Sequence, residues 1–478
     1  MKKQIVILAV CLLVAVALGG ALWFLMGYEP EGSSSSPIPE VDESLRLNQR
    51  NISELDTLQI QNETGSYTIR YLGDSQYTIE ELEKAELNVS MISSAASPAA
   101  SLTATSLVTE TPENLGDFGL DKPRVTFSAR YTDGSEFVLE LGNDAPGGNG
   151  VYGKVKGTDP VYQLSSYSFG NTFKGMLEYV NTTITEPPSG NTETLPDKIS
   201  LGGVLRPETL VIERNDNTTE EEKNYSLNLY KVTAPKDRAV DSDDAVNALT
   251  SLLSITAESV AAYDPDADQL KKFGLDTPYS TADFSYQDEE ENRYQVSLLV
   301  SEPDAEGYAY LMRGGVPLVY RVKTADLPWY EMTYGDFIAT LQLLPHIDSI
   351  SEIKVESPSK SYTFHLEGEG DEMKVTSGGQ TLEDKPFRQY YQTLIGLPSE
   401  EFTEDPAPDE SQALLKVTFT YRDSSKKPDY IALLPGPTRK LFLSVNGESE
   451  FYTKASYLDT ILQNSEKLLA GENVDPLY

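Results

Sequence analysis

The chain has 478 residues, room for about three ordinary domains, and its 39% hydrophobic content is enough for buried cores, which excludes a disordered protein. With 38 basic residues against 75 acidic residues, its formal charge of −37 repels nucleic-acid phosphates and anionic lipid headgroups. We therefore exclude nucleic acid and polybasic membrane docking, and interpret the charge as keeping a surface-exposed protein in solution.

The first predicted element is a membrane-spanning helix over residues 5–27. No charged residue occurs within this range, and a helix of that length, at about 1.5 Å per residue, crosses a hydrocarbon layer of about 30 Å. Lys2 and Lys3 indicate that the tip, residues 1–4, stays in the cytoplasm. The rest of the chain is then expected on the outer side of a bacterial cell membrane, held by a single pass.

Two features leave the processing of this segment open. Its apolar run is longer than the roughly 7 to 15 residues that are usual in a cleaved signal peptide, which favours an uncleaved anchor. The small residues at Ala17–Ala21 keep cleavage as the alternative. The single cysteine, Cys11, lies within the apolar run, so the outer body is expected to use no disulfide and to depend on core burial.

Residues 28–50 are predicted to form a flexible tether between the anchor and the folded body. They contain four consecutive serines, Ser33–Ser36, followed by Pro37-Ile38-Pro39. Serine-rich and proline-rich composition of this kind is typical of semi-extended linkers. The tether would hold the folded body away from the membrane surface.

A six-residue phrase occurs twice, as Phe118–Pro123 (FGLDKP) and Phe273–Pro278 (FGLDTP), 155 positions apart. This period is too long for a solenoid repeat of about 20 to 50 residues, so each copy should be a domain-sized unit with its own core. A similar pattern of hydrophobic residues recurs a third time without the phrase. We predict three related modules, the third of them divergent, at residues 51–188, 196–342 and 346–471.

Each module is predicted to follow the order β-β-α-β-β-β-β-α, an α+β pattern with mainly antiparallel sheets. In the first module, the opening hairpin is expected to pair Leu58–Ile60 with Tyr67–Tyr71. The corresponding pairs in the second and third modules are expected to be Leu210–Ile212 with Tyr225–Leu229, and Ile353–Val355 with Tyr362–Leu366.

The repeated phrase is predicted to end a short helix in each of the first two modules. Gly119 and Gly274 suit the left-handed position that follows a helix, and the proline four residues later prevents continuation. A functional interpretation would make Asp121 and Asp276 ligands or acids. An aspartate beside a turn commonly bonds its own backbone, however, so we interpret both as structural.

Three further features accompany the phrase: the hairpin sequence Tyr131–Phe137 (YTDGSEF), the run Leu141–Gly148 (LGNDAPGG) and the single N-terminal anchor. Together they resemble the bacterial family called domain of unknown function 4340. The first module is similar over most of its length, the second through its phrase and hairpins, and the third only through its strand pattern.

The resemblance implies a role as well as a fold. Similar proteins are often encoded beside ABC-transporter subunits of the gliding-motility type, which implies an accessory role at the outer face of an export or surface-remodelling system. The family has no established catalytic residues, so the resemblance supplies none for this chain.

No pattern in the chain identifies a catalytic, cofactor-binding or metal site, and we predict none. His346 and His365 are too few for a histidine-based metal cluster. The sequence Ser357–Lys360 (SPSK) has the Ser-x-x-Lys spacing of penicillin-binding enzymes. It falls in a predicted hairpin turn, however, and the Lys-Thr-Gly partner of such enzymes is missing, so we interpret it as a turn.

Two loops have ligand-binding alternatives. The turn Asp264–Asp268 spaces three carboxylates like a calcium loop, yet Gln269 and Leu275 occupy the positions that require Gly and Glu. We favour a solvated acidic turn and keep weak calcium binding as the alternative. The loop Asp144–Gly150 would let its backbone approach a ligand closely, although such loops are more commonly hairpin tips.

These observations favour a non-enzymatic accessory protein that presents tyrosine-bearing sheet surfaces to a membrane protein partner, with ABC-transporter subunits as the expected partners. The 28 tyrosines suit protein interfaces and glycan stacking alike. The alternative is therefore an extracytoplasmic module that binds cell-wall glycan or peptide. A hydrolase is a third hypothesis, supported only by the abundance of Asp and Glu. No cofactor is expected.

Overall fold

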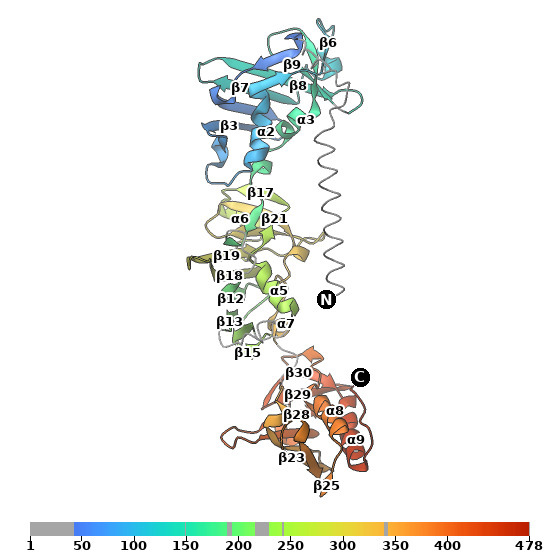
Figure 1. Cartoon of the computed structure of the whole chain (residues 1–478). Helices are drawn as coiled ribbons and strands as arrows, with labels where there is room; N and C mark the ends of the chain where they lie inside the picture. Colours follow the sequence, from blue (N-terminus) through green and yellow to red (C-terminus); the bar gives the residue numbers. More distant parts are fainter. Residues whose placement is uncertain are drawn as a thin grey trace, which may run out of the picture. The chain divides into compact units, whose positions relative to one another are not determined.

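A computed structural model describes residues 43–148, 150–188, 194–215, 229–240, 243–338 and 343–477 (Figure 1). The predicted membrane-spanning helix over 5–27 and the tether as far as residue 42 lie outside the described residues. Among the residues that are described, no helix is both long enough and apolar enough to cross a membrane.

The chain divides into two compact units. The first takes the described residues up to Glu83 together with Leu87–Tyr179, and the second takes Lys84–Glu86 together with the described residues from Val180 onward. Folded structure begins earlier than the predicted start at 51, because a 3-10 turn and strand β1 occupy Glu43–Gln49. The first unit also ends before the predicted boundary at 188, since β11 pairs with β16 inside the second unit.

The first unit contains an eight-stranded antiparallel sheet and a two-stranded one. Helix α2 (Val89–Ala100) contacts β2 and β4 and buries Ile92 and Ala96 against the sheet. In spatial order the large sheet is β4 (Gln76–Ile79), β3 (Gly65–Gly73), β2 (Leu55–Asn62), β7 (Val125–Tyr131), β8 (Glu136–Asp144), β9 (Gly150–Val155), β10 (Val161–Ser165) and β6 (Ser106–Thr109). The small sheet is β1 (Arg46–Gln49) and β5 (Ser101–Thr103), and the short helices are η1 (Glu43–Leu45), η2 (Ile52–Glu54), η3 (Glu80–Leu82), η4 (Leu115–Phe118), α3 (Ser166–Phe169), η5 (Gly170–Phe173) and η6 (Met176–Tyr179).

The second unit contains two nine-stranded antiparallel sheets. The first of them is β15 (Arg238–Ala239), β14 (Tyr230–Ala234), β13 (Leu210–Arg214), β12 (Pro196–Gly202), β18 (Ser280–Gln287), β19 (Arg293–Val300), β20 (Tyr308–Arg313), β21 (Leu318–Lys323) and β17 (Ser259–Tyr263). Its other elements are β11 (Thr183–Thr185), β16 (Ile255–Thr256), α5 (Asp243–Ser251), α6 (Ala267–Lys272), η8 (Thr324–Asp326) and α7 (Tyr334–Phe337).

The third large sheet has helices α8 (Asp384–Ile395) and α9 (Ser456–Ala470) side by side (Figure 1). Its strands are β25 (Gln380–Thr381), β24 (Lys374–Ser377), β23 (Ser361–Glu367), β22 (Ile350–Glu356), β27 (Leu415–Tyr421), β28 (Asp429–Pro435), β29 (Lys440–Val445), β30 (Glu448–Lys454) and β26 (Glu401–Phe402), with 3-10 turns η9 (Ile347–Ser349), η10 (Gly370–Glu372) and η11 (Glu410–Gln412).

The three large sheets share one strand order. In each, the opening strand lies beside the strand that follows the connecting helix and phrase region: β2 beside β7, β12 beside β18, and β22 beside β27. Alternate residues of β7 are buried, so Val125 and Phe127 reach the core while Thr126 and Ser128 face outward. The prediction of an α+β fold with mainly antiparallel sheets is confirmed, and the structure is richer in strands than in helices.

The predicted order of elements was incomplete. It omitted one of the three opening strands of each sheet (β4, β12 and β24) and the edge strand that follows the helix (β6, β17 and β26). In the second module β13 pairs with β14, but β14 begins at Tyr230, and the predicted partner residues 225–228 lie outside the described residues. The true opening strand there is β12, because Ile199 and Leu201 alternate with polar residues over a stretch too short to stand out.

Candidate functional site

The repeated phrase forms the end of a short helix in both copies, as predicted. In the first copy the backbone N–H of Gly119, in the left-handed conformation with φ of 67°, donates to the carbonyls of Gly116 and Leu115. In the second copy Gly274 has φ of 69° and closes helix α6 in the same way. These are the conformations in which glycine avoids the cost that a Cβ would bring.

The aspartates of the phrase point away from the cores, whereas the leucines beside them are buried. Leu120 and Leu275 are 3% and 4% exposed, and Asp121 and Asp276 are exposed. The structure therefore gives the phrase a packing role in both copies.

The phenylalanine of each phrase packs against a tyrosine of the following sheet strands. Phe118 lies edge-to-face on Tyr152 of β9, with ring centroids 5.1 Å apart, and Phe273 lies in the same way on Tyr310 of β20, at 4.6 Å. Such pairs contribute about 0.5–1.5 kcal/mol beyond the area they bury. The two copies thus repeat one aromatic contact as well as one turn.

The Leu141–Gly148 run lies directly against the phrase of the first copy. A Cβ at position 142 would lie 2.1 Å from the carbonyl oxygen of Phe118, and a Cβ at position 119 would lie 2.4 Å from Oδ1 of Asn143. The backbones approach so closely that only glycine fits at either point. The two most distinctive motifs of the first module therefore form one packed junction.

The loop that follows this run is a hairpin tip. The N–H of Ala145 donates to the carbonyl of Gly150 at 2.8 Å, and Gly147 and Gly148 both have positive φ. Arg124 forms an ion pair with Asp144 at 3.0 Å. These contacts stabilise a tight turn, as the more ordinary interpretation predicted.

The Ser-x-x-Lys sequence is a turn between β22 and β23. The hydroxyl and N–H of Ser357 bond to the backbone of Lys360, and the lysine ammonium forms an ion pair with Glu466 of α9. The serine does not begin a helix, which the enzyme motif would require. The prediction of a hairpin turn is confirmed.

The acidic turn before α6 caps that helix. The carboxylate of Asp266 accepts from the N–H of Gln269 at 2.8 Å, while the Gln269 side chain accepts from the N–H of Asp266 at 2.9 Å. Asp264 has φ of 47° and its N–H donates to Pro317. Within the described part of the chain, no three His, Cys, Asp or Glu side chains are grouped so as to hold a metal ion.

The two histidines lie apart on the third module. His365 on β23 is 3.2 Å from Glu352 on the neighbouring strand, and His346 is 3.8 Å from Asp348. Both imidazoles are largely exposed. They do not share a site.

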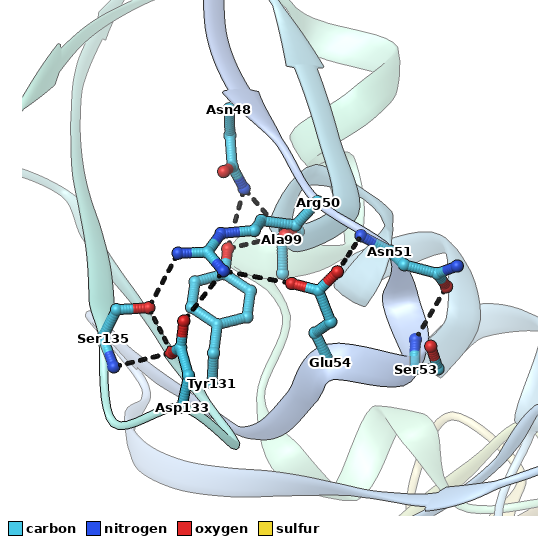
Figure 2. A network of polar contacts seen from close by, with 9 residues as sticks. All are labelled: Asn48, Arg50, Asn51, Ser53, Glu54, Ala99, Tyr131, Asp133 and Ser135. Atoms are coloured by element: carbon cyan, nitrogen blue, oxygen red, sulfur yellow. Dashed lines mark hydrogen bonds and ion pairs between the residues drawn. The ribbon is translucent and has the colours of Figure 1, made fainter.

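A polar network that the sequence did not reveal joins the start of the first unit to the β7–β8 hairpin (Figure 2). The guanidinium of Arg50 forms ion pairs with Glu54 and Asp133, both at 3.0 Å, and donates to the hydroxyl of Ser135 at 2.9 Å. It also lies over the ring of Tyr131, 4.8 Å from its centroid. Arg50 was predicted to lie in the tether, but its side chain binds the YTDGS turn.

The same turn is held from two further directions. Asn48 donates to the Tyr131 hydroxyl at 2.8 Å, and that hydroxyl donates to the carbonyl of Ala99 at the end of α2 (Figure 2). Hydrogen bonds from the hydroxyl and N–H of Ser135, and then from Arg50, lower the pKa of Asp133 to about 2. Asp133 is therefore a fixed anion of the turn rather than a proton carrier at neutral pH.

A buried arginine holds the second sheet to the segment before α7. Arg206 is 5% exposed and donates to the carbonyls of Gly202, Trp329, Tyr330 and Met332 and to the Ser280 hydroxyl. Burial lowers the pKa of Arg206 to about 10. All these acceptors are neutral, so the guanidinium is fixed by hydrogen bonds alone and serves packing.

A buried carboxylate on β30 binds two cationic side chains within the second unit. Glu450, 6% exposed, accepts from Lys236 at 2.7 Å, from Arg238 at 2.8 Å and from the Tyr334 hydroxyl at 3.0 Å. Burial acts to raise the pKa of Glu450, but the hydrogen bonds from Lys236 and Arg238 together outweigh it, so this pKa lies below its usual value. The arrangement is a satisfied ion cluster that ties β14–β15 to β30.

The tyrosines serve the cores more than the surface. Among the described residues, the only exposed tyrosines are Tyr167, which is 91% exposed, and Tyr294, which is 40% exposed. The buried ones are Tyr67, Tyr77, Tyr131, Tyr179, Tyr230, Tyr286, Tyr320, Tyr330, Tyr390, Tyr391, Tyr421, Tyr452 and Tyr457.

Two surface features stand out once the buried networks are set aside. Edge strand β6 of the first sheet carries Leu107 and Val108, each 39% exposed. The outer face of the second sheet has a shallow hollow of about 360 Å³, lined mainly by polar residues such as Ser200, Asp283 and Ser297, with Phe284 and Val296 between them. The first feature is apolar and the second is polar, so they suit different ligands.

The comparisons with known proteins agree with the repeat. The family model described as Domain of unknown function (DUF4340) matches residues 78–261 and again residues 230–417. The two matches begin 152 positions apart (230 − 78), close to the spacing of the repeated phrase, and together they cover well over half of the chain. No curated protein matches the sequence significantly. The chain belongs to the family known as Domain of unknown function (DUF4340), and carries it in two overlapping copies.

Proposed function

We propose that this protein is a non-enzymatic, membrane-anchored extracytoplasmic accessory protein, and that its modules form a protein-interaction scaffold associated with an ABC-type transport or envelope system. One observation carries the proposal. The residues of the repeated phrase in the first module, from Phe118 to Leu120, and Gly142 beside them pack against their own sheet, which supports a structural role for this motif.

Two further observations support a scaffold. The three large sheets share one strand order, which supports the interpretation of the third as a divergent copy. Exposed apolar side chains at Leu107, Val108 and Tyr167 lie on the first unit, where a partner would bury them. The uncharged run at residues 5–27 supports a single-pass anchor with the modules outside the cell.

The proposed membrane topology is tested by treating intact, wall-stripped cells with a protease, with the full-length protein tagged at each end in turn. We expect loss of the C-terminal tag and protection of the N-terminal tag. Protection of both tags until lysis would overturn the proposed topology.

The scaffold is tested by crosslinking the tagged full-length protein in its native membrane and identifying the captured proteins by mass spectrometry. We expect multi-span membrane proteins, transporter subunits among them, to be recovered. Recovery of wall fragments alone would contradict the scaffold and favour the second candidate.

The second candidate is a module that binds cell-wall glycan or peptide, and the polar hollow on the second sheet favours it. The hydroxyl of Ser297 donates to Asp283 across β18 and β19, and Lys198 forms an ion pair with Glu213 at 2.8 Å beside them. Such groups suit a hydroxylated ligand. Asp283→Ala in the full-length protein would then reduce its binding to isolated envelope material, whereas Asp121→Ala, on an exposed turn elsewhere, would not.

A further inference from the structure

Strand β6 is an open edge of the first large sheet. It pairs with β10 alone among the described strands, and it stands last in the spatial order of that sheet. An edge strand presents alternate N–H and C=O groups to solvent, ready to pair with another extended chain. The other two sheets end in equivalent strands, β17 and β26, which allow a direct comparison.

The equivalent edges of the second unit have neighbours. On β26, Phe402 packs edge-to-face against Tyr334 with centroids 5.5 Å apart, and Glu401 forms an ion pair with Lys440. On β17, the hydroxyl of Tyr263 accepts from the N–H of Lys84 at 3.3 Å. Neither strand carries an exposed large hydrophobic side chain.

The β6 edge differs because its side chains are apolar and exposed. Leu107 pairs with Tyr162 of β10, Val108 lies at a register shift between Leu107 and Thr109, and each of the two side chains is 39% exposed. Tyr167, 91% exposed, follows two residues after the end of β10, the partner strand. Adjacent exposed apolar residues on an edge strand are a feature that native proteins usually avoid unless the edge is used.

The surroundings of β6 are acidic. Glu110 and Glu113 follow the strand directly and are exposed, and exposed Asp159 lies in the turn before β10, close to the end of β6. Lys156 lies in the same turn, which leaves the group net negative. An added strand that carries lysine or arginine beside its apolar residues would complement these charges.

We infer that β6 accepts an extended segment of a partner protein as a ninth strand of the first sheet, and that this segment combines apolar with basic residues. The inference rests on the proposed scaffold function and names the surface and the chemistry of its partner. Main-chain hydrogen bonds supply affinity in this mode, and side chains on alternating faces supply specificity. A second copy of this chain is the poorer occupant, because each copy has a formal charge of −37.

The test places a photo-crosslinking amino acid at position 108 of the full-length protein in the cells that produce it. The matched control has it at position 72, where the leucine is 57% exposed on β3, at the other end of the sheet from β6. We expect position 108, and not position 72, to crosslink to one defined peptide of another protein, and this peptide to carry net positive charge. A crosslink to this chain itself, to an acidic segment, or equally from both positions would overturn the inference.

A second variant checks the charge argument. Glu110→Lys with Glu113→Lys should reduce the crosslink yield from position 108 at least about tenfold, because it removes the complementary charge from two exposed positions. Hydrogen exchange of the β10 amides shows whether the sheet is intact in this variant. Unchanged yield with an intact sheet would contradict a basic partner segment.

The outcomes separate the two proposals. If the tagged protein captures membrane partners while position 108 yields no crosslink, the scaffold function is supported and the binding of a partner segment at β6 is contradicted. If neither assay captures a membrane protein, both proposals fail together.

Discussion

The two copies of the Phe-Gly-Leu-Asp phrase share a turn but differ in how closely the next strand approaches it. In the first module a Cβ at Gly119 would lie 2.4 Å from Asn143, whereas a Cβ at Gly274 in the second module would meet only Ser301, at 3.4 Å. Ser301 stands where the first module has Gly142. The left-handed turn is thus common to both copies, and the tight backbone approach belongs to the first alone.

This difference shows what each glycine does. Gly274 is needed for its positive φ, while Gly119 is needed both for its φ and for the space beside it. Gly142 has no unusual φ and is needed for space only. The second module therefore has space for a Cβ at Gly274, whereas the first module has none at Gly119.

The largest loss of stability is expected from Gly142→Ser, which places in the first module the residue that the second module has at the equivalent position. Its Cβ would overlap the Phe118 carbonyl, so we expect a loss of about 3 kcal/mol in the unfolding free energy of the first unit. Thermal unfolding of the full-length protein, with hydrogen exchange to locate the effect, measures it. The reciprocal Ser301→Gly removes a side chain whose hydroxyl accepts from the N–H of Tyr310 and donates to the carbonyl of Glu302, and it should cost about 1 kcal/mol. Equal losses would contradict the comparison.

The next effect distinguishes φ from space. Gly274→Ala should cost about 1 kcal/mol because only the left-handed backbone is strained, and Gly119→Ala should cost about 2 kcal/mol more because Asn143 must move. Gly134→Ala is the matched control in the first module, since Gly134 has φ of 83° and nothing within 4 Å of its Cβ. If Gly119→Ala behaves like Gly134→Ala in chemical denaturation, the close approach is unimportant.

A smaller effect should be the same in both copies. Phe118→Leu and Phe273→Leu each remove an edge-to-face contact with a tyrosine and should each cost about 1 kcal/mol. Local hydrogen exchange at Tyr152 and Tyr310 reports on each module separately. A large cost in one module and none in the other would show that the aromatic contact is not a shared part of the fold.

The smallest effect concerns the hairpin turns, where Asp133 of the first module corresponds to Asp288 of the second. The pKa of Asp133 is lowered from 3.8 to about 2, so the folded state favours the anion. Its contribution to stability is complete above about pH 4 and is lost as the pH falls through about 2. Asp133→Asn should therefore reduce the stability of the first unit at neutral pH and flatten its dependence on pH in that window.

The second hairpin supplies the control for that prediction. The pKa of Asp288 is also lowered, mainly by the hydrogen bond from the Asn292 side chain, and no arginine takes part. Asp288→Asn should change acid unfolding in the same direction, and only the Asp133 effect should become smaller in an Arg50→Met background, where the hydrogen bonds from Ser135 remain. Circular dichroism during acid titration follows both. Loss of both effects with Arg50→Met would contradict separate turns.

Sequence patterns were sufficient where a signal was local. The β7–β8 hairpin could be read from alternation between Val125 and Leu141, and the left-handed glycines from their place after a short helix. The short strands β4 and β6 were missed because four residues hold too little alternation to separate them from loops.

The Arg50 network was missed for a different reason. Its partner Asp133 is 83 positions away, and no local pattern couples a residue between β1 and β2 to the turn between β7 and β8. The only nearby signal was the capping pair of Asn51 and Glu54, which marks the start of a helical turn and therefore the end of the tether. Long-range polar contacts of this kind depend on the folded topology. The β6 edge and the hollow on the second sheet depend on it as well, so local sequence patterns could not predict them.

The Arg50 network also has a mechanical consequence. Tension applied to the chain before Glu43 would reach the first unit through β1, where it would meet Asn48 within the strand and Arg50 directly after it. Those two side chains divide the pull between the end of α2 and the β7–β8 hairpin at the centre of the sheet. A force from the N-terminal side would therefore act on the most extensively paired strands of the unit. It would be distributed over the sheet before any one strand separates.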